Sequence, residues 1–238
     1  MTYPLRLVVG LLLCMVAVSG CRMRDYNHRP DASAAPSATS AKPIIAAPAA
    51  AKPVTLAAPN WYIPRAAWAV QKIHVDRTTP MGVKPFRITV HHSADIRLPN
   101  GTRETGDAVA LLRFVEDSHV RGAGKNEPFA CIGYHYIIAA DGKVYEGRPL
   151  QFQGAHSTGD NNIGNIGICL LGDFDKHKVP AVQRQRLAEV LNRLCASYSI
   201  TPSRTTVLCH KDFKATACPG RYLEPIVREL SSGRKFIE

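Results

Sequence analysis

From residue 61 onward, the pattern of hydrophobic and polar positions alternates between strand-like and helix-like segments. The run 87-RITVHH-92 is typical of a strand, because its apolar residues recur at a period of two. Residues 107–120 repeat apolar positions at the helical spacing i, i+3, i+4, i+7, and these positions are Ala108, Leu111, Leu112 and Val115. Pro180 favours the start of a second helix, whose apolar face would consist of Leu187, Val190, Leu191 and Leu194.

The segments between and after these helices predict the rest of a sheet. Within 134–148, two β-rich runs meet at an Asp-Gly pair, which is a strong signal for a hairpin. The apolar run 166-IGICLLG-172 predicts a buried strand, 205–210 predicts a short strand, and 222–230 predicts a closing helix. Strands interspersed with helices predict one α/β (α+β) domain with a single mixed central sheet flanked by helices.

The first 60 residues differ in composition from the rest. Residues 1–20 contain one positive charge, an apolar run of twelve residues and small residues at the end, which is the pattern of an export signal peptide. The form 18-VSGC-21 resembles a bacterial lipobox and predicts cleavage before Cys21, which would then carry lipid; an ordinary secretory signal is the alternative. Residues 21–60 are rich in Ala and Pro, which predicts a disordered tether and places the folded domain at 61–238.

This leader predicts a location in the cell envelope, with membrane attachment through the lipid on Cys21. Arg22 stands where an aspartate would favour the inner membrane, so the periplasmic face of the outer membrane is expected in a Gram-negative cell. The formal net charge of +11 favours polyanionic partners, and in this location we expect wall polymers or lipid head groups and no nucleic acid. We expect a monomer.

The cysteines divide by position. Cys14 would leave with the signal peptide and Cys21 would carry the lipid, so five remain in the domain. An odd number indicates that one of them has a role other than pairing. The other four could form two disulfides or remain buried thiols, and they are Cys131, Cys169, Cys195 and Cys209. The sequence leaves this open, although Cys169 lies in an apolar run that favours a buried thiol.

The stretch 207-VLCHKDFKATACPG-220 places a histidine at a strand end and a cysteine eight residues later. A zinc site uses imidazole and thiolate ligands, and His210 and Cys218 would supply two of them. A third could be His91 or His92, which point to opposite faces of a strand, and alternation alone does not choose between them. A cysteine nucleophile with a histidine base, or two unrelated core residues, are the alternatives.

Five segments together resemble the zinc-dependent N-acetylmuramoyl-L-alanine amidase family, which includes phage lysozyme-type amidases and peptidoglycan recognition proteins. They are 90-VHHSA-94, 133-GYHYIIAADGKVYEGR-148, 154-GAHSTG-159, 166-IGICLLGD-173 and 208-LCHKDFKATACPG-220. The resemblance covers about residues 61–230. It implies peptidoglycan or muropeptides as substrate, and hydrolysis of the amide between N-acetylmuramic acid and L-alanine of the stem peptide by a zinc-activated water.

The resemblance also implies roles for individual positions. The zinc ligands would be His91, His210 and Cys218, which chooses His91 over His92. Tyr134 and Thr216 would be catalytic. Substrate contacts would involve His156, Asn161 and Asn162, although 159-GDNNIGNIG-167 departs from the family's usual residues and leaves the details of these contacts open.

A non-catalytic peptidoglycan-binding module is the second interpretation. Family members that only bind commonly lack the cysteine ligand, whereas Cys218 is present here.

Other polar residues of the domain are expected to have lesser roles. We expect His135 to pack beneath the site and Glu146 either to pair with Arg148 or to act as an acid near the site. His119 and His177 are expected on the surface.

Overall fold

The computed structural model describes residues 61–96, 106–122 and 127–233. The predicted signal peptide, the lipidation site Cys21 and the tether lie outside these residues, so those predictions remain as stated. Within the described part, no helix combines the length and apolar character needed to cross a membrane.

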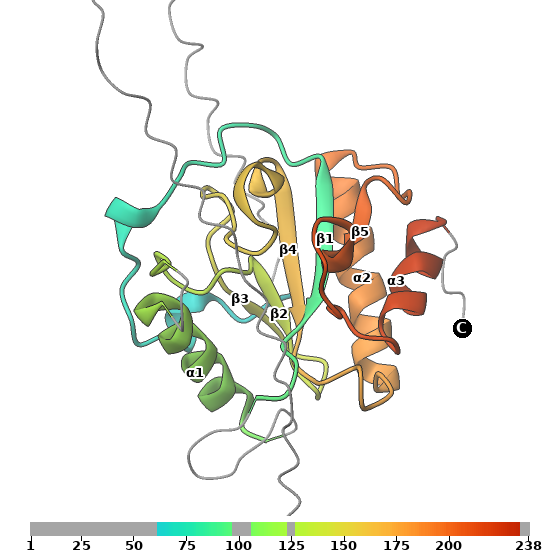
Figure 1. Ribbon diagram of the computed structural model, residues 1–238, viewed down its shortest axis with the longest axis horizontal. Helices are drawn as coiled ribbons and strands as arrows, with labels where there is room; N and C mark the ends of the chain where they lie inside the picture. The colour runs from blue at the N-terminus through green and yellow to red at the C-terminus, as the bar shows by residue number, and fades with distance from the viewer. Residues whose placement is uncertain (1–60, 97–105, 123–126, 234–238) are drawn as a thin grey trace, which may run out of the picture. The chain divides into compact units, whose positions relative to one another are not determined.

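A five-stranded mixed sheet forms the centre of the domain (Figure 1), as predicted. In spatial order it consists of β3 (Val144–Glu146), β2 (Tyr136–Ile138), β4 (Asn165–Leu170), β1 (Arg87–His92) and β5 (Val207–Cys209). Neighbouring strands are parallel except β2 and β3, which form the expected antiparallel hairpin. Gly142 in its turn has a φ of +80°, which glycine adopts without strain.

Helices cover both faces of this sheet, with α1 on one side and α2 and α3 on the other (Figure 1). They are α1 (Ala108–Arg121), α2 (Ala181–Tyr198) and α3 (Glu224–Ser231). Short 3₁₀ helices occupy Arg65–Ala67, Val75–Arg77, Gly159–Asn162 and His210–Asp212. The predicted leucines of α1 and α2 are buried, which confirms both helical periodicities.

Side-chain alternation along β1 divides the core into two clusters. Ile88 and Val90 belong to the larger cluster, which includes residues of α2 and α3. His91 pairs in register with Cys169 of β4, and Cys169 belongs to the cluster that contains Leu111 of α1. Because paired residues of a sheet share a face, His91 lies on the α1 side of the sheet.

The cysteines of the described domain are all free thiols. Four of them are buried, and they are Cys131, Cys169, Cys195 and Cys209. Of the two alternatives, these cysteines therefore remain buried thiols and do not form disulfides. Cys218 is half-buried, so its thiol is more accessible than those of the other four cysteines.

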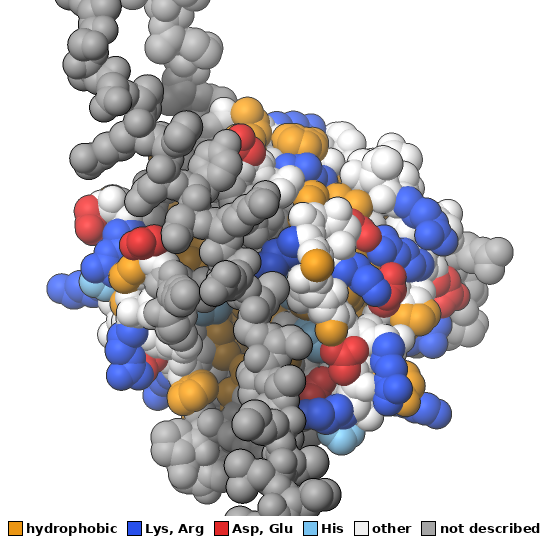
Figure 2. Space-filling model, viewed as in Figure 1, with side chains coloured by type: hydrophobic (Ala, Val, Ile, Leu, Met, Phe, Trp, Pro, Cys, Tyr) orange, Lys and Arg blue, Asp and Glu red, His pale blue; other side chains and the backbone are white. Residues whose placement is uncertain are grey.

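Basic side chains are spread over the face shown in Figure 2. Near the loop that follows β5, Lys211, Lys214 and Arg221 are exposed. This distribution agrees with the positive net charge of the chain.

Replacing Asp107 with alanine should lower the free energy of unfolding by about 1 kcal/mol. The Asp107 carboxylate caps α1, where it accepts hydrogen bonds from the backbone N–H groups of Val109 and Ala110 at 2.9 and 3.2 Å. Urea titration of the two proteins measures the difference. Asp107→Asn keeps an accepting oxygen and should recover most of the loss, and equal losses in both variants would contradict a capping role.

Candidate metal centre

Three side chains meet at the C-terminal ends of β1 and β5. His91 lies near the end of β1, His210 follows β5 directly, and Cys218 lies in the next loop. Their ligand atoms all lie within 4.8 Å of one another, with His91 Nδ1 3.7 Å from Cys218 Sγ. A nitrogen and a sulfur that share a tetrahedral zinc lie about 3.6 Å apart. The spacing therefore fits a zinc ion held by these three residues.

The environment of His210 gives an independent indication of a metal site. Its Nε2 atom is buried and has no hydrogen-bond partner among the described residues. A buried polar atom without a partner costs free energy, and a cation bound at this nitrogen would remove that cost.

His92 points away from this cluster. Its Nδ1 accepts a hydrogen bond from the Phe174 N–H at 3.2 Å, and the two rings lie 6.3 Å apart. The Phe174 carbonyl in turn accepts a hydrogen bond from the Tyr222 N–H at 2.9 Å. His92 therefore supports the segment that follows Cys218, while His91 reaches the cluster itself.

His92 also lies close to Asp173 and Asp175, but both carboxylates already have protein partners. Asp173 pairs with Lys176 at 2.9 Å, and Asp175 accepts a hydrogen bond from the Arg221 N–H at 3.0 Å. This group stabilises the local loop.

On their own, the three cluster side chains are uncharged at neutral pH. Burial and the neighbouring imidazoles of His156 and His210 hold the pKa of His91 well below its usual value. Burial and Lys214 lower the pKa of His210 to about 4, and burial raises the pKa of the Cys218 thiol to about 11. A bound metal would displace one proton, from the thiol. A thiol with a high pKa also argues against the cysteine-nucleophile alternative, which needs a thiolate.

Tyr134 lies beside the cluster, on the loop that precedes β2. The centre of its ring is 5.1 Å from that of His91. Burial, together with the thiols of Cys169 and Cys218, raises the pKa of Tyr134 well above its usual value. The phenol therefore keeps its proton at neutral pH and can donate a hydrogen bond.

Thr216 lies in the same loop as the cysteine of the cluster. Its Oγ1 accepts a hydrogen bond from the Cys218 N–H at 3.3 Å. The hydroxyl keeps its own proton for donation to a further acceptor.

The three residues predicted to contact substrate lie in the segment between β3 and β4, which contacts His91 through the ring of His156. His156 is only 6% exposed, and its Nδ1 lies 3.1 Å from His91 Nε2. Asn162 is also buried, and its Oδ1 accepts hydrogen bonds from the N–H groups of His156 and Ser157. Asn161 is half-buried, and its carbonyl accepts a hydrogen bond from a buried amide of β4. Substrate contact stays a prediction for these three residues, whereas their role in organising the loop is visible.

The surface position expected for His119 is wrong. Its Nδ1 accepts a hydrogen bond from the Gly133 N–H at 3.1 Å, and its ring lies 5.7 Å from that of Tyr134. Burial, with a smaller effect of Arg148, lowers the pKa of His119 to about 4. The spacing of seven residues from Leu112 places His119 on the buried face of α1 and could have indicated this. His177 is exposed, as expected.

His135 and Glu146 have structural partners. His135 is fully buried, and its Nδ1 accepts a hydrogen bond from the Gly167 N–H at 2.9 Å. Of the two alternatives for Glu146, pairing with Arg148 is wrong: a carboxylate oxygen of Glu146 accepts the Arg65 N–H at 3.0 Å, and no ion pair joins Glu146 to Arg148 among the described residues. The Arg148 guanidinium instead donates to backbone carbonyls, which belong to Cys131, Ile132 and Gln153.

Replacing Asp212 with asparagine should lower the free energy of unfolding at pH 7 by about 1 kcal/mol, because solvent screens this exposed ion pair. The Asp212 carboxylate accepts hydrogen bonds from Arg228 at 2.5 and 2.8 Å and from the Cys209 N–H at 2.8 Å. Although partial burial opposes ionisation, these donors hold the pKa of Asp212 below its usual value. The stabilisation is therefore complete above the unfolded pKa of about 4 and is lost as the pH falls through the folded pKa.

Urea titrations at several pH values check this expectation. The difference between the wild type and Asp212→Asn should shrink below about pH 4, and a difference that stays constant would contradict it. Glu189→Gln is the control, because the side chains of the Glu189–Arg186 pair are more exposed than those of the Asp212–Arg228 pair and should contribute only about 0.3 kcal/mol.

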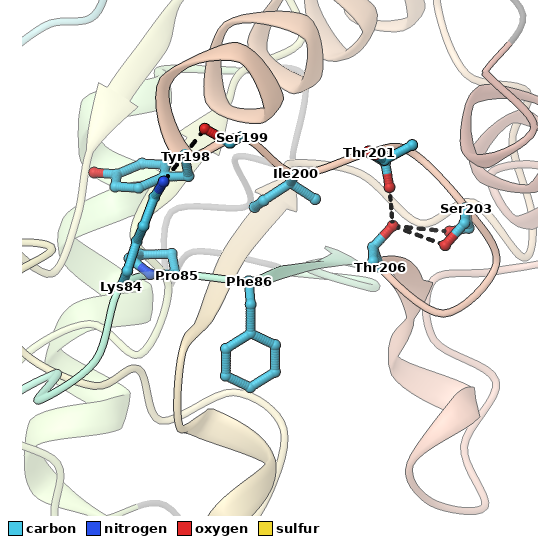
Figure 3. Close-up of a pocket in the computed structure, with 9 residues that line it drawn as sticks. All are labelled: Lys84, Pro85, Phe86, Tyr198, Ser199, Ile200, Thr201, Ser203 and Thr206. Atoms are coloured by element: carbon cyan, nitrogen blue, oxygen red, sulfur yellow. Dashed lines mark hydrogen bonds between the residues drawn. The ribbon is translucent and has the colours of Figure 1, made fainter.

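A separate hollow of about 530 Å³ lies at the opposite, N-terminal ends of β1 and β5 (Figure 3). Phe86, Ile200 and Tyr198 supply its apolar lining. The Thr206 hydroxyl in it is bonded within the protein, because its Oγ1 donates to the Thr201 carbonyl at 2.6 Å. No imidazole, thiol or carboxylate is among its lining residues, so it does not offer the ligand types of a zinc site.

Comparison with known proteins gives relatives of the chain. Residues 81–221 match the family described as N-acetylmuramoyl-L-alanine amidase. Peptidoglycan recognition protein 3 of Mus musculus is 27% identical over 172 residues, which cover 72% of this chain and 46% of the mouse protein, so the chain spans about half the length of that relative. Peptidoglycan recognition protein 1 of Bos taurus is 31% identical over 143 residues, which cover 52% of this chain and 75% of the bovine protein.

Solved structures share the fold. N-acetylmuramoyl-L-alanine amidase LysC from Clostridium intestinale URNW superposes with a TM-score of 0.52 at 26% identity, covering 68% of this chain and 95% of LysC. Peptidoglycan recognition protein-LE, solved in complex with tracheal cytotoxin, superposes with a TM-score of 0.55 at 28% identity, covering 69% of this chain and 91% of that chain. The family match spans more than half of the sequence, and the chain belongs to the N-acetylmuramoyl-L-alanine amidase family.

Proposed function

We propose that the chain is a zinc-dependent peptidoglycan hydrolase that cleaves the amide between N-acetylmuramic acid and L-alanine of the stem peptide. The observation that carries the proposal is the convergence of His91, His210 and Cys218, with the buried Nε2 of His210 left without a partner among the described residues. A bound Zn²⁺ would polarise the scissile carbonyl and lower the pKa of a water molecule toward about 7.

The chain's own residues supply the remaining polar groups. The Tyr134 phenol remains protonated and lies beside His91, so it would donate a hydrogen bond to the carbonyl oxygen as negative charge develops there. Thr216, in the loop that carries Cys218, would supply a second donor. In the low-dielectric interior of a protein, a hydrogen bond from either donor is electrostatically stronger than the same bond in water.

We propose further that lipid on Cys21 anchors the protein in the cell envelope as a monomer, and that residues 21–60 form a tether. At about 3 Å per residue, such a tether could extend roughly 120 Å and let the domain reach the wall from the membrane. Radiolabelled fatty acid should be incorporated into the wild type and not into Cys21→Ala.

Release of free stem peptide from purified cell walls by the zinc-loaded protein tests the activity. Zinc-loaded protein that releases none would contradict the proposal. Binding to the walls without release would favour the alternative of a recognition module, a role supported by the names of the animal relatives.

A further inference from the structure

We infer that His156 is a positioning residue that holds His91 in the tautomer able to bind a metal through Nδ1. The inference deepens the proposed function, because it rests on the metal centre. It assigns to His156 a role behind the ligand in place of direct contact with substrate.

Hydrogen bonding determines where His156 carries its proton. Its Nε2 lies 3.2 Å from the backbone carbonyl oxygen of Asn165. A carbonyl oxygen only accepts, so Nε2 carries the hydrogen. No hydrogen bond or ion pair joins this buried ring to a carboxylate among the described residues, so the ring is neutral and has one N–H. The other ring nitrogen, Nδ1, must therefore be an acceptor.

The acceptor on His156 then determines the tautomer of His91. His91 Nε2 lies 3.1 Å from His156 Nδ1, which carries no hydrogen and can only accept a hydrogen bond. His91 must donate from Nε2, and its Nδ1 is left with the lone pair. That Nδ1 is the atom that faces Cys218 Sγ at 3.7 Å. A relay of two hydrogen bonds thus connects a backbone carbonyl of β4 to the ligand atom of His91.

Close packing and hydrogen bonds fix the position of the His156 ring. A Cβ atom on Gly154 would lie 2.6 Å from His156 Nε2, and one on Gly167 would lie 2.7 Å from the same atom, so both positions need glycine to leave space for the ring. The Ser157 hydroxyl lies 2.8 Å from His156 Nδ1 and donates to the same lone pair, so Nδ1 accepts a three-centre hydrogen bond from Ser157 and His91. These contacts hold the ring in one orientation, as supporting residues of metal ligands commonly do.

Zinc affinity of the full-length protein, measured by competition with a chromophoric chelator, tests the inference. His156→Leu removes the acceptor and should weaken zinc binding by about 10- to 100-fold. His156→Asn can place an accepting oxygen near the position of Nδ1 and should recover part of the affinity. Thr89→Val is the control, because it removes a different buried hydrogen bond on the same face, from Thr89 to Asn165 at 3.0 Å, and should leave affinity within about twofold.

Nitrogen-15 NMR of the wild type before zinc addition provides a second readout that needs no variant to fold. The His91 ring should be protonated at Nε2. Protonation at Nδ1, or a His156→Leu affinity within about twofold of the wild type, would overturn the inference. Failure of the proposed function would look different: the wild type would bind no zinc or release no stem peptide, whatever the tautomer of His91.

Discussion

Replacing Cys218 with serine should abolish tight zinc binding and reduce amide cleavage by about 10³-fold or more. Cys218 lies 3.7 Å from His91 Nδ1 and is the only ligand that would bring a negative charge to the cluster. A serine hydroxyl does not ionise near neutral pH and is a poor zinc ligand. The measurements are the zinc content of the purified protein and the rate of stem-peptide release.

Cys195→Ser is the matched control for this variant. Cys195 is a free, buried thiol on α2, and α2 covers the face of the sheet opposite the metal cluster. Its replacement should leave zinc content and specific activity near those of the wild type. A Cys218→Ser protein that keeps zinc and full activity would show that the cluster is not the reaction centre.

Replacing Tyr134 with phenylalanine should lower kcat by about 10²- to 10³-fold while zinc affinity stays within about twofold. The ring of Tyr134 lies 5.1 Å from that of His91, and the phenol remains protonated because its pKa is raised. In the proposed function, removing the hydroxyl would delete a hydrogen-bond donor for the substrate oxygen and keep the ring that packs the site. Steady-state kinetics on a soluble muropeptide, with parallel zinc titration, measures both quantities.

Tyr136→Phe makes the same chemical change two residues away. The Tyr136 ring packs with Trp61 and Tyr62 in the larger cluster, so its loss should leave kcat within about threefold. If Tyr134→Phe lowered zinc affinity as strongly as kcat, Tyr134 would support the metal centre and would not act on the substrate.

The elements that carry the site could be predicted from local patterns. The alternation in β1 and the helical spacing in α1 each arise because one face of the element is buried, and this burial produces a regular spacing of apolar residues in the sequence. The Asp-Gly hairpin follows from local turn chemistry, since Gly142 adopts a positive φ. These features depend on neighbours in the chain, and the structure confirms all of them.

The choice between His91 and His92 could not be made from the same pattern. Alternation separates the two faces of β1, but which face bears the site depends on the pairing of His91 with Cys169 and on the approach of Cys218 from a distant loop. The position of His119 against Tyr134 likewise depends on how α1 packs on the sheet. Such contacts arise only in the folded chain, and the resemblance to a family supplied the preference for His91.

Mass spectrometry of the products from one defined muropeptide, with and without a zinc chelator, tests the central claim most directly. The account predicts release of the intact stem peptide with a free L-alanine amino group and of a sugar that keeps its lactyl carboxyl group. It predicts loss of both products in chelator and their return when zinc is restored. Cleavage that continues in chelator after zinc has been removed, or cleavage at a different bond, would contradict the account.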